Sequence, residues 1–431
     1  MRPQRIRDPI HDLIGFSSEQ DEPIWELVNT RPVQRLRRIK QLGFSEFVYP
    51  GATHTRFSHV IGAMQMARRM LAAFEKSDAI DVKNDEHELK RTATIAAALL
   101  HDVGHGPYSH VFEELCTEFK IGKEHEEWTA EIIKSKEIAD ILVKFGLYDE
   151  VISFFDTEKA YTPYSTIISS QMDCDRLDFL CRDRYFCGLR SSFIDLEWLF
   201  DSLLIEKVLI DIKKDIEQFS FVVDPKGLRV VEEFVISYLK MYNDVYYHKT
   251  TRAVQHMVSE IIKLGLRFNH CVVTNHPLGQ FFLSSSHRTL EHYMALDDSS
   301  VVSLVHLISE NEIGEATILA QRYLRRDLYK CLEIPPGDDG APKQRIKKFI
   351  GKLKAENIFH IIDIIGGKTY KQYEVADKRF LENILVKDGE EHIRLHSASK
   401  IIKSMPTQAS RIYFSNSEDK QKALLLLKSL T

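Results

Sequence analysis

The chain has 431 residues, of which 44% are hydrophobic and 28% charged, a composition typical of folded domains with a substantial core. Its formal net charge of -5 excludes a global positive field, so any site for nucleic acid, anionic lipid or another polyanion has to be local. The basic start lacks a signal-peptide core, and we find no uncharged apolar run near the ~18 residues that span a bilayer. These features predict a cytoplasmic protein without a membrane partner.

Helical periodicity dominates the sequence. Apolar residues recur every three or four positions between Val60 and Phe74, and the run Ile95 to Leu100 is typical of the interior of a buried helix. Similar patterns cover four later stretches, 124–145, 165–187, 228–265 and 299–332. A strand signal is confined to short stretches such as Phe219 to Val223, which precedes a turn. We therefore predict a mainly α fold with minor β elements.

A stretch rich in Pro, Gly and Asp, from Ile334 to Pro342, interrupts the helical pattern. We predict that it separates a catalytic body, residues 1–335, from a smaller C-terminal α+β region, residues 343–431, with a regulatory or packing role. Within it, the basic segment Gln344 to Lys354 predicts an amphipathic helix packed on the body. The alternative is a surface for polyphosphate or nucleic acid, which the acidic overall balance disfavours.

The segment LLHDVGHGPYSH, residues 99–110, concentrates metal-binding and proton-handling side chains at the end of the apolar run. Glycines after His101 and Asp102 stop that helix, and Pro107 is suited to begin the next one. A helix from Pro107 would place His110 and Glu113 one turn apart, where the carboxylate can hold the tautomer of the imidazole. Taken alone, the His101–Asp102 pair could equally be a helix cap.

Two other segments offer further metal ligands. His59 lies in HTRFSH, at the start of the helix predicted through Val60 to Phe74, and Asp175 lies in QMDCDRLDFLCRD. Read singly, His59 is a core histidine and Asp175 the partner of a nearby arginine. Together with His101 and Asp102 they form a mixed nitrogen and oxygen set that suits one divalent ion, Mn, Fe, Ni or Zn, with positions open for water and substrate.

Several motifs of the sequence, taken together, resemble those of a known family. The chain resembles the HD-domain phosphohydrolases, in particular the branch of deoxynucleoside triphosphate (dNTP) triphosphohydrolases whose vertebrate member carries a sterile alpha motif. The resemblance covers about residues 1–330 in family order, through DPIHD (8–12), VQRLRRIKQLG (33–43), YPGATHTRFSHVIG (49–62), LLHDVGHGPYSHVFE (99–113), DCDRLDFLCRD (173–183) and VYYHKTTR (245–252). It implies an HD-domain helical bundle with its core at about residues 50–185 and a helical extension to about 335. The implied reaction converts dNTPs to deoxynucleoside and inorganic triphosphate, by attack of a metal-activated water at the alpha-phosphate.

The resemblance also implies roles for individual residues. It assigns the metal to His59, His101, Asp102 and Asp175, admits Mg as well, and implies a second Mg carried by the nucleotide. His110 is the candidate general acid, oriented by Glu113, while His105 and His125 bind phosphate or relay protons. The remaining substrate contacts fall to Gln41 and Asp183 at the sugar and to Arg56, Arg176, Tyr246, His248 and Lys249 at the phosphates. For His125 the alternative is a surface histidine, and for Tyr246 and His248 the polar face of a helix.

Partners are implied in the same way. Relatives form dimers and tetramers, so the resemblance implies a homo-oligomer, and Arg35 and Arg37 match residues of a site for a nucleotide effector. The sequence departs from the vertebrate pattern at Asn29, where that enzyme uses an aspartate to recognise guanine, and at Asn243–Asp244, where it has two arginines near the substrate phosphates. The base preference of an effector therefore does not carry over.

Two other classes of function remain open. One is an HD phosphohydrolase of another specificity, such as a nucleotidase, pyrophosphohydrolase or phosphodiesterase. The other is a regulatory or nucleic-acid-binding scaffold whose HD site is vestigial. The complete set of four ligands favours an enzyme, because a vestigial site could lose His59 or Asp175 without penalty.

Overall fold

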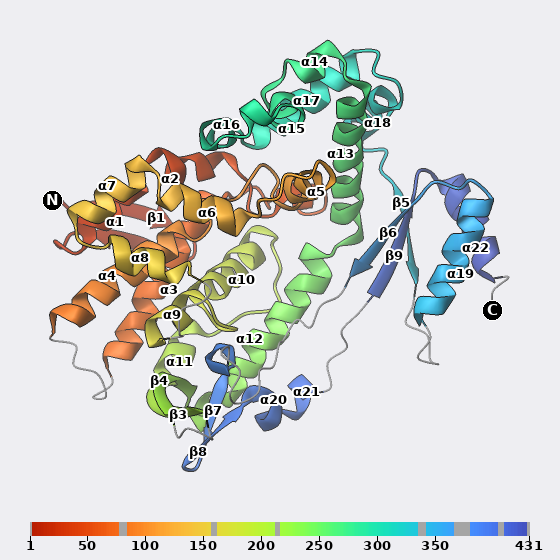
Figure 1. Ribbon diagram of the computed structural model, residues 1–431. Coiled ribbons are helices and arrows are strands. Elements are labelled where there is room, and N and C mark those ends of the chain that lie inside the picture. The colour runs from red at the N-terminus through yellow and green to blue at the C-terminus, as the bar shows by residue number, and fades with distance from the viewer. Residues whose placement is uncertain are drawn as a thin grey trace.

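The computed structural model describes residues 2–76, 84–156, 162–211, 216–334, 342–365, 380–403 and 409–428. Most of these residues lie in helices, and the strands form small sheets, which confirms the predicted mainly helical class (Figure 1). Within the ranges given, we find no helix that is both long enough and apolar enough to cross a membrane.

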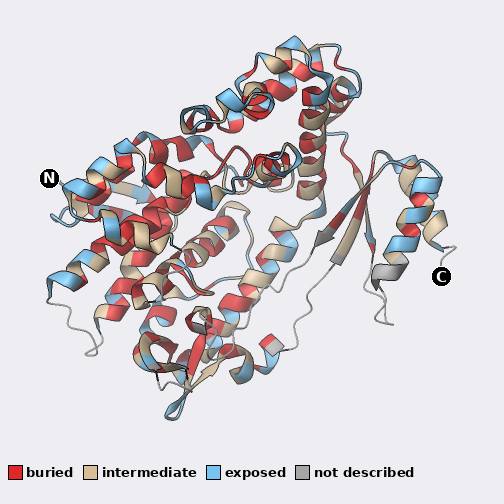
Figure 2. Cartoon of the chain, in the orientation of Figure 1, coloured by how far each residue is buried: buried red, intermediate tan, exposed pale blue. Residues whose placement is uncertain are grey.

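Three packed helices form the centre of the body. Helix α3 (Arg56–Glu75) packs against α4 (Asp85–Leu100) and α10 (Cys174–Phe186). The predicted apolar stripe of α3 is buried, as is the alanine-rich end of α4, whose small side chains let neighbouring helices approach closely (Figure 2). Gly62 marks the closest approach, because a Cβ there would lie 1.9 Å from the Asp178 Oδ1 atom of α10.

The other helices of the body lie around this centre and to one side of it (Figure 1). Their bounds are α1 (Asp21–Val28), α2 (Arg31–Arg35), α5 (His110–Glu118), α6 (His125–Ile133), α7 (Lys136–Lys144), α8 (Tyr148–Phe154), α9 (Pro163–Ile168), α11 (Leu196–Asp201), α12 (Leu228–Met241), α13 (Lys249–Phe268), α14 (Cys271–Thr274), α15 (Pro277–Leu283), α16 (Leu290–Ala295), α17 (Asp298–Glu310) and α18 (Glu315–Leu324).

The four later helical patterns in the sequence are each divided in the structure, whereas the pattern from Val60 to Phe74 forms the single helix α3. The stretch 124–145 forms α6 and α7, and 165–187 forms α9 and α10. In the second case Asp173 accepts the Arg176 amide at 2.8 Å and so caps a new helix. Between α12 and α13 a π-helical turn, η4 (Tyr242–Tyr246), interrupts the predicted continuous helix. The stretch 299–332 ends in a strand rather than a helix.

The strands of the described residues form three sheets. A hairpin pairs β1 (Gln4–Asp8) with β2 (Asp12–Phe16). A four-stranded sheet has the order β3-β4-β7-β8, from β3 (Leu203–Asp211), β4 (Ile216–Val223), β7 (Leu385–Asp388) and β8 (Glu391–Arg394). A three-stranded antiparallel sheet has the order β5-β9-β6, from β5 (Lys330–Ile334), β6 (His360–Ile365) and β9 (Ala409–Phe414). The predicted strand at 219–223 lies within β4.

The C-terminal residues pack in two places. Helices α19 (Pro342–Ala355) and α22 (Ser417–Lys428) cover the β5-β9-β6 sheet on the side away from α13, whereas α20 (Leu395–Ala398) and α21 (Lys400–Lys403) lie near α12 (Figure 1). The predicted amphipathic helix is present in α19, with Phe349 and Leu353 buried, but it packs on this sheet instead of on the body. Strand β5 precedes the predicted boundary and joins a sheet with strands that follow it. Most of the Pro-rich break, residues 335–341, lies outside the described residues.

Candidate metal centre and active site

The turn after α4 presents the histidines of the central motif. Helix α4 ends at Leu100, and His101 is its C-cap, as the glycines after it predict. The next helix, α5, begins at His110, three residues after the predicted start at Pro107. The reason is backbone conformation: Tyr108 and Ser109 have φ values of 50° and 39°, in the left-handed region that cannot continue a helix.

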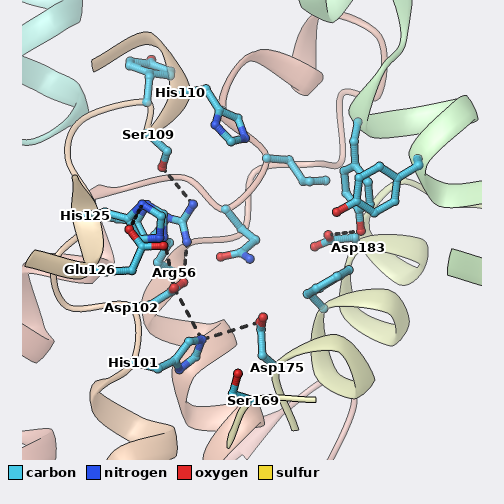
Figure 3. Close-up of a pocket in the computed structure, with 18 of the residues that line it drawn as sticks. Arg56, His101, Asp102, Ser109, His110, His125, Glu126, Ser169, Asp175 and Asp183 are labelled. Carbon is cyan, nitrogen blue, oxygen red and sulfur yellow. Dashed lines mark hydrogen bonds and ion pairs between the residues drawn. The ribbon is translucent and has the colours of Figure 1, made fainter. Parts of the chain in front are cut away.

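The four predicted metal ligands come together from α3, the turn after α4 and α10, and Figure 3 shows three of them, His101, Asp102 and Asp175. The Nε2 atom of His59 lies 3.0 Å from Asp175 Oδ1 and 3.9 Å from Asp102 Oδ2. The Nε2 atom of His101 lies 3.5 Å from Asp102 Oδ1 and 3.6 Å from Asp175 Oδ1. Two imidazole nitrogens and two carboxylates therefore face one small volume.

The other nitrogen of each imidazole fixes its orientation. The Nδ1 atom of His59 forms a 2.8 Å hydrogen bond with Asp178 Oδ2, and Nδ1 of His101 donates to the Ala98 carbonyl at 2.8 Å. Both Nε2 atoms thus point into the cluster, and among the described residues neither has a well-directed hydrogen-bond partner. Buried nitrogens left in this state, with Nδ1 already committed, fit a bound metal ion.

The side chains that support His59 from behind were not predicted from the sequence. Asp178 also accepts two hydrogen bonds from Arg182, at 2.8 and 2.9 Å, and one from His11 Nε2 at 2.7 Å. Arg182 in turn binds Asp8 in a forked arrangement at 2.8 and 3.2 Å. All these side chains are buried. Asp8 and His11, at the turn between β1 and β2, are therefore connected through Asp178 and Arg182 to the candidate metal ligand His59. The sequence places Asp175, Asp178 and Arg182 on one face of a helix, but it does not show the contacts of that face with His11 and His59.

The electrostatics of the cluster favour a cation. Burial by itself would raise the pKa of Asp102, but Arg56 and the nearby imidazoles hold this pKa well below its ordinary value. Burial opposes a proton on His59, yet its contacts with Asp175 and Asp178 raise its pKa to about 10. The carboxylates that attract a proton there would equally attract a divalent ion. The donor set therefore fits the predicted metal.

A second group of side chains surrounds the metal cluster. Arg56 is paired with Asp102 and donates through Nη2 to Ser109 Oγ at 2.8 Å. The ring of His105 stacks on that of His125, with centroids 4.1 Å apart. Its Nε2 atom lies 3.1 Å from Asp102 Oδ1, and its Nδ1 atom is buried without a partner among the residues described. Burial and the charge of Arg56 lower the pKa of His105 to about 3, so this imidazole is neutral.

Glu113 contacts two histidines rather than one. Its Oε1 atom lies 2.8 Å from His125 Nδ1, while its Oε2 atom lies 3.3 Å from His110 Nδ1. Despite the opposing effect of burial, these contacts lower the pKa of Glu113 and raise that of His125. The His110 side chain is 75% exposed, so the predicted acid lies at the mouth of the site. Glu113 therefore orients both imidazoles as a fixed anion.

The predicted sugar contacts lie on the other side of the metal cluster. Asp183 accepts a hydrogen bond from the Tyr246 hydroxyl at 2.7 Å and lies 2.7 Å from His54 Nε2. Gln41 also lines the cavity, and its Oε1 atom has no partner within the described ranges. The sequence analysis did not assign His54, although it occurs in the motif that contains His59.

Several predicted residues point elsewhere. Arg176 is paired with Asp173 and donates to the Ser170 carbonyl, and His248 caps α13 by accepting the Thr250 amide at 3.2 Å. Lys249 borders a separate, smaller hollow with Arg326 and Lys330. None of the three lines the cavity at the metal cluster, and their proposed phosphate contacts stay predictions.

The two arginines matched to an effector site differ in exposure. Arg35 is buried and donates to the carbonyls of His105 and Leu296, both at 2.9 Å, so it supports the catalytic turn from behind. Arg37 is exposed, and its guanidinium lies 3.5 Å from the centre of the Phe57 ring. A nucleotide approaching this region would meet Arg37 rather than Arg35.

A cavity of about 1740 Å³ joins these groups. Its lining includes three side chains of the metal cluster, the groups around them and the predicted sugar contacts: His101, Asp102, Asp175, Arg56, His105, His110, His125, Asp183 and Tyr246. Part of its lining comes from α8 and α9, which we call the α8–α9 arm, and another part comes from α13 and β6, which we call the α13–β6 arm. The volume exceeds the ~300–1,000 Å³ of typical small-molecule sites, so the cavity can hold a nucleotide and still contain water.

The turn that carries the histidines is also fixed by Asp298, the first residue of α17. Its Oδ2 and Oδ1 atoms accept the amides of Lys40 and Tyr108, at 2.9 and 2.8 Å. Burial raises the pKa of Asp298 to about 6, above the value of about 3.9 in an unfolded chain. The folded state therefore favours the protonated form, and the stability linked to this proton is complete below about pH 4 and lost as the pH rises towards about 6.

We expect this titration to appear as a difference between the wild-type protein and Asp298→Asn. Relative to the variant, the wild-type free energy of unfolding should fall by about 2 kcal/mol between about pH 4.5 and about pH 7.5, because each pKa unit corresponds to about 1.4 kcal/mol. Urea unfolding of both proteins at the two pH values measures this change. A difference that stays constant with pH would contradict the raised pKa.

Comparison with known proteins agrees with this geometry. Residues 56–169, which include three of the four metal-cluster side chains, match the HD domain. The chain is 31% identical to the uncharacterized protein YwfO of Bacillus subtilis over 339 residues, which is 78% of this chain and 73% of that protein. The chain belongs to the HD-domain phosphohydrolases.

This HD-domain protein is also similar to a curated protein in sequence and to a solved structure in fold. It is 23% identical to the deoxynucleoside triphosphate triphosphohydrolase SAMHD1 of Bos taurus, over 93% of this chain and 70% of that protein. A phosphohydrolase crystal structure from Bacteroides thetaiotaomicron superimposes with a TM-score of 0.72 at 24% identity, covering 96% of this chain and all of the other. The latter supports the HD-like fold over the described parts of the chain.

Proposed function

We propose that this protein hydrolyses deoxynucleoside triphosphates to deoxynucleoside and inorganic triphosphate. The observation that carries the proposal is the order of groups along the cavity. Phosphate-binding chemistry, supplied by the metal cluster with Arg56, is followed by a carboxylate and hydroxyl pair, Asp183 and Tyr246, that can bind a sugar. The similarity to the bovine dNTP triphosphohydrolase supports the same substrate class.

Each group has a defined task in this proposal. A divalent ion held by His59, His101, Asp102 and Asp175 would polarise the phosphate and supply an activated water. Arg56 presents a forked donor beside the cluster, where negative charge increases during phosphoryl transfer. His105 is neutral and its Nε2–H faces Asp102 Oδ1, so its unpartnered Nδ1 atom is an acceptor that can take a hydrogen bond from a water molecule, which suits the proton-relay role.

Proton transfer falls to the groups at the mouth of the site. His110 contacts solvent and is oriented by Glu113. This position suits a general acid that delivers a proton to the 5′ oxygen of the leaving deoxynucleoside and regains a proton from water. On the sugar side, His54 and Tyr246 hold Asp183 in place, so that its carboxylate can receive a hydroxyl of the substrate.

A substrate panel with product identification tests the proposal. The metal-loaded protein is incubated with each of the four dNTPs and with the corresponding ribonucleotides, and deoxynucleoside and triphosphate are quantified. Release of pyrophosphate with a monophosphate would assign a different bond, and turnover of ribonucleotides or phosphodiesters alone would assign another specificity within the family. Failure of every substrate, under Mn and under Mg, would contradict the proposed enzyme.

A further inference from the structure

The cavity arm between α13 and β6 is built from two distant parts of the chain. Its walls continue from Tyr246 and Tyr247, next to the sugar contacts. The lining residues of this arm are Thr251, Arg252, Gln255 and His256 of α13 and Ile361, Ile362 and Asp363 of β6. The C-terminal region thus contributes directly to the cavity that holds the metal cluster.

Polar contacts hold the two walls together. Arg252 donates through Nε and Nη2 to the two carboxylate oxygens of Asp363, at 3.1 and 2.8 Å, and through Nη1 to Gln255 Oε1 at 2.8 Å. Arg411 of β9 donates to the Tyr247 carbonyl. A forked arginine–carboxylate pair fixes orientation as well as distance, so the arm is a defined part of the fold.

Two buried polar atoms in this arm lack partners. The Thr251 side chain is buried, and its Oγ1 atom makes no hydrogen bond to any described residue. The same holds for Nε2 of His256, whose nearest carboxylate oxygen, Asp363 Oδ2, is 3.8 Å away. Buried polar atoms are nearly always paired, and both of these residues line the cavity. The opposite arm, along α8 and α9, contains no such atom within the described ranges.

We propose that the α13–β6 arm receives the base of the substrate nucleotide, and that Thr251 and His256 hydrogen-bond the edge of the base. The assignment rests on the proposed function, which places the phosphates at the metal cluster and the sugar at Asp183 and Tyr246. The base then occupies the next stretch of the cavity. A base has flat apolar faces and a polar edge. The faces can pack against Tyr247, Ile361 and Ile362, and the edge can hydrogen-bond the two unpartnered atoms.

Base selectivity measures this role directly. A hydroxyl and an imidazole can each donate or accept a hydrogen bond, so both side chains can discriminate between bases. We expect Thr251→Val and His256→Phe to change the ratio of kcat/KM between the best and the poorest dNTP by roughly three- to tenfold, the effect of one neutral hydrogen bond. Metal content and melting temperature are recorded for each variant, because a folding defect would alter all four substrates alike.

Ser259→Ala is a matched control. Ser259 lies on the same helix, is buried, and has an unpartnered Oγ atom among the described residues, but it does not line the cavity. Its variant should keep the wild-type ratios. Unchanged ratios in both Thr251→Val and His256→Phe, or an equal change in Ser259→Ala, would overturn the proposal.

A separate measurement distinguishes failure of this inference from failure of the proposed function. If the wild-type protein hydrolyses no dNTP, the function is rejected, and binding of the four deoxynucleoside 5′-monophosphates is measured by calorimetry. Weaker binding to Thr251→Val than to Ser259→Ala would still support a base pocket in this arm. Equal affinities for the two variants would reject it.

Discussion

Replacement of Asp175 by alanine should remove both the bound divalent ion and the hydrolytic activity. The Asp175 carboxylate lies 3.0 Å from His59 Nε2 and 3.6 Å from His101 Nε2, and it is the metal-cluster side chain supplied by α10. Without it, three ligands remain, and one side of the cluster is open. We expect kcat to fall by roughly 10³-fold or more, since polarisation of the phosphate is worth at least as much as one donor of an oxyanion hole.

Elemental analysis of the dialysed protein and turnover of its best dNTP measure the two effects. Asp140→Ala, which removes an exposed carboxylate from α7, should retain wild-type metal content and activity. If Asp175→Ala binds metal normally but is inactive, Asp175 acts on the substrate and is not a ligand. If it is fully active, the metal site lies elsewhere.

Replacement of Asp178 by asparagine should weaken both metal binding and the fold. Asp178 is the buried anion shared by His11, His59 and Arg182. A neutral amide leaves the buried guanidinium of Arg182 with Asp8 alone, and loss of one partner of a buried pair typically costs about 3–5 kcal/mol. Because Asp178 also orients His59, metal affinity should fall by about 10–100-fold, as observed when other partners of ligating histidines are removed.

Metal titration and urea unfolding test the two parts of this prediction. Asp12→Asn provides the control. Asp12 lies in the β1–β2 hairpin, as Asp8 does, and pairs with Arg7, but the side chains of Asp12 and Arg7 are largely exposed. Exposed pairs contribute little to stability, so this variant should behave like the wild type. A stable Asp178→Asn protein with wild-type metal affinity would show that His59 is held in place without its carboxylate partner.

The residues of the metal cluster were predictable because ligand chemistry restricts the choice. Imidazole and carboxylate side chains next to helix ends are few, so His59, His101, Asp102 and Asp175 could be named as a candidate set before the structure showed that they lie together. The helical class was predictable for a similar reason, since a repeated apolar stripe has few alternatives to a packed helix. Both inferences depend on local sequence.

Features that depend on distant contacts were not predictable. His11 meets Asp178 across 167 positions of sequence, and β6 lines the cavity next to α13, where Asp363 pairs with Arg252, 111 positions away. The start of α5 was misplaced because Pro107 permits a helix, while the left-handed conformation of Tyr108 and Ser109 depends on their surroundings. Burial of a single side chain was not predictable either. Arg35 matches a residue of an effector site in the motif, yet it is buried behind the turn that carries His105.

The left-handed pair Tyr108 and Ser109 is held from both sides. The Tyr108 ring stacks on Phe44 with centroids 4.0 Å apart, its amide is bound by Asp298, and Ser109 accepts a hydrogen bond from Arg56. Such backbone angles cost about 1–3 kcal/mol per residue, and the contacts that form when the chain folds offset this strain. A nucleotide entering the cavity would then find His110 already in place, and none of its affinity would be consumed in ordering the loop.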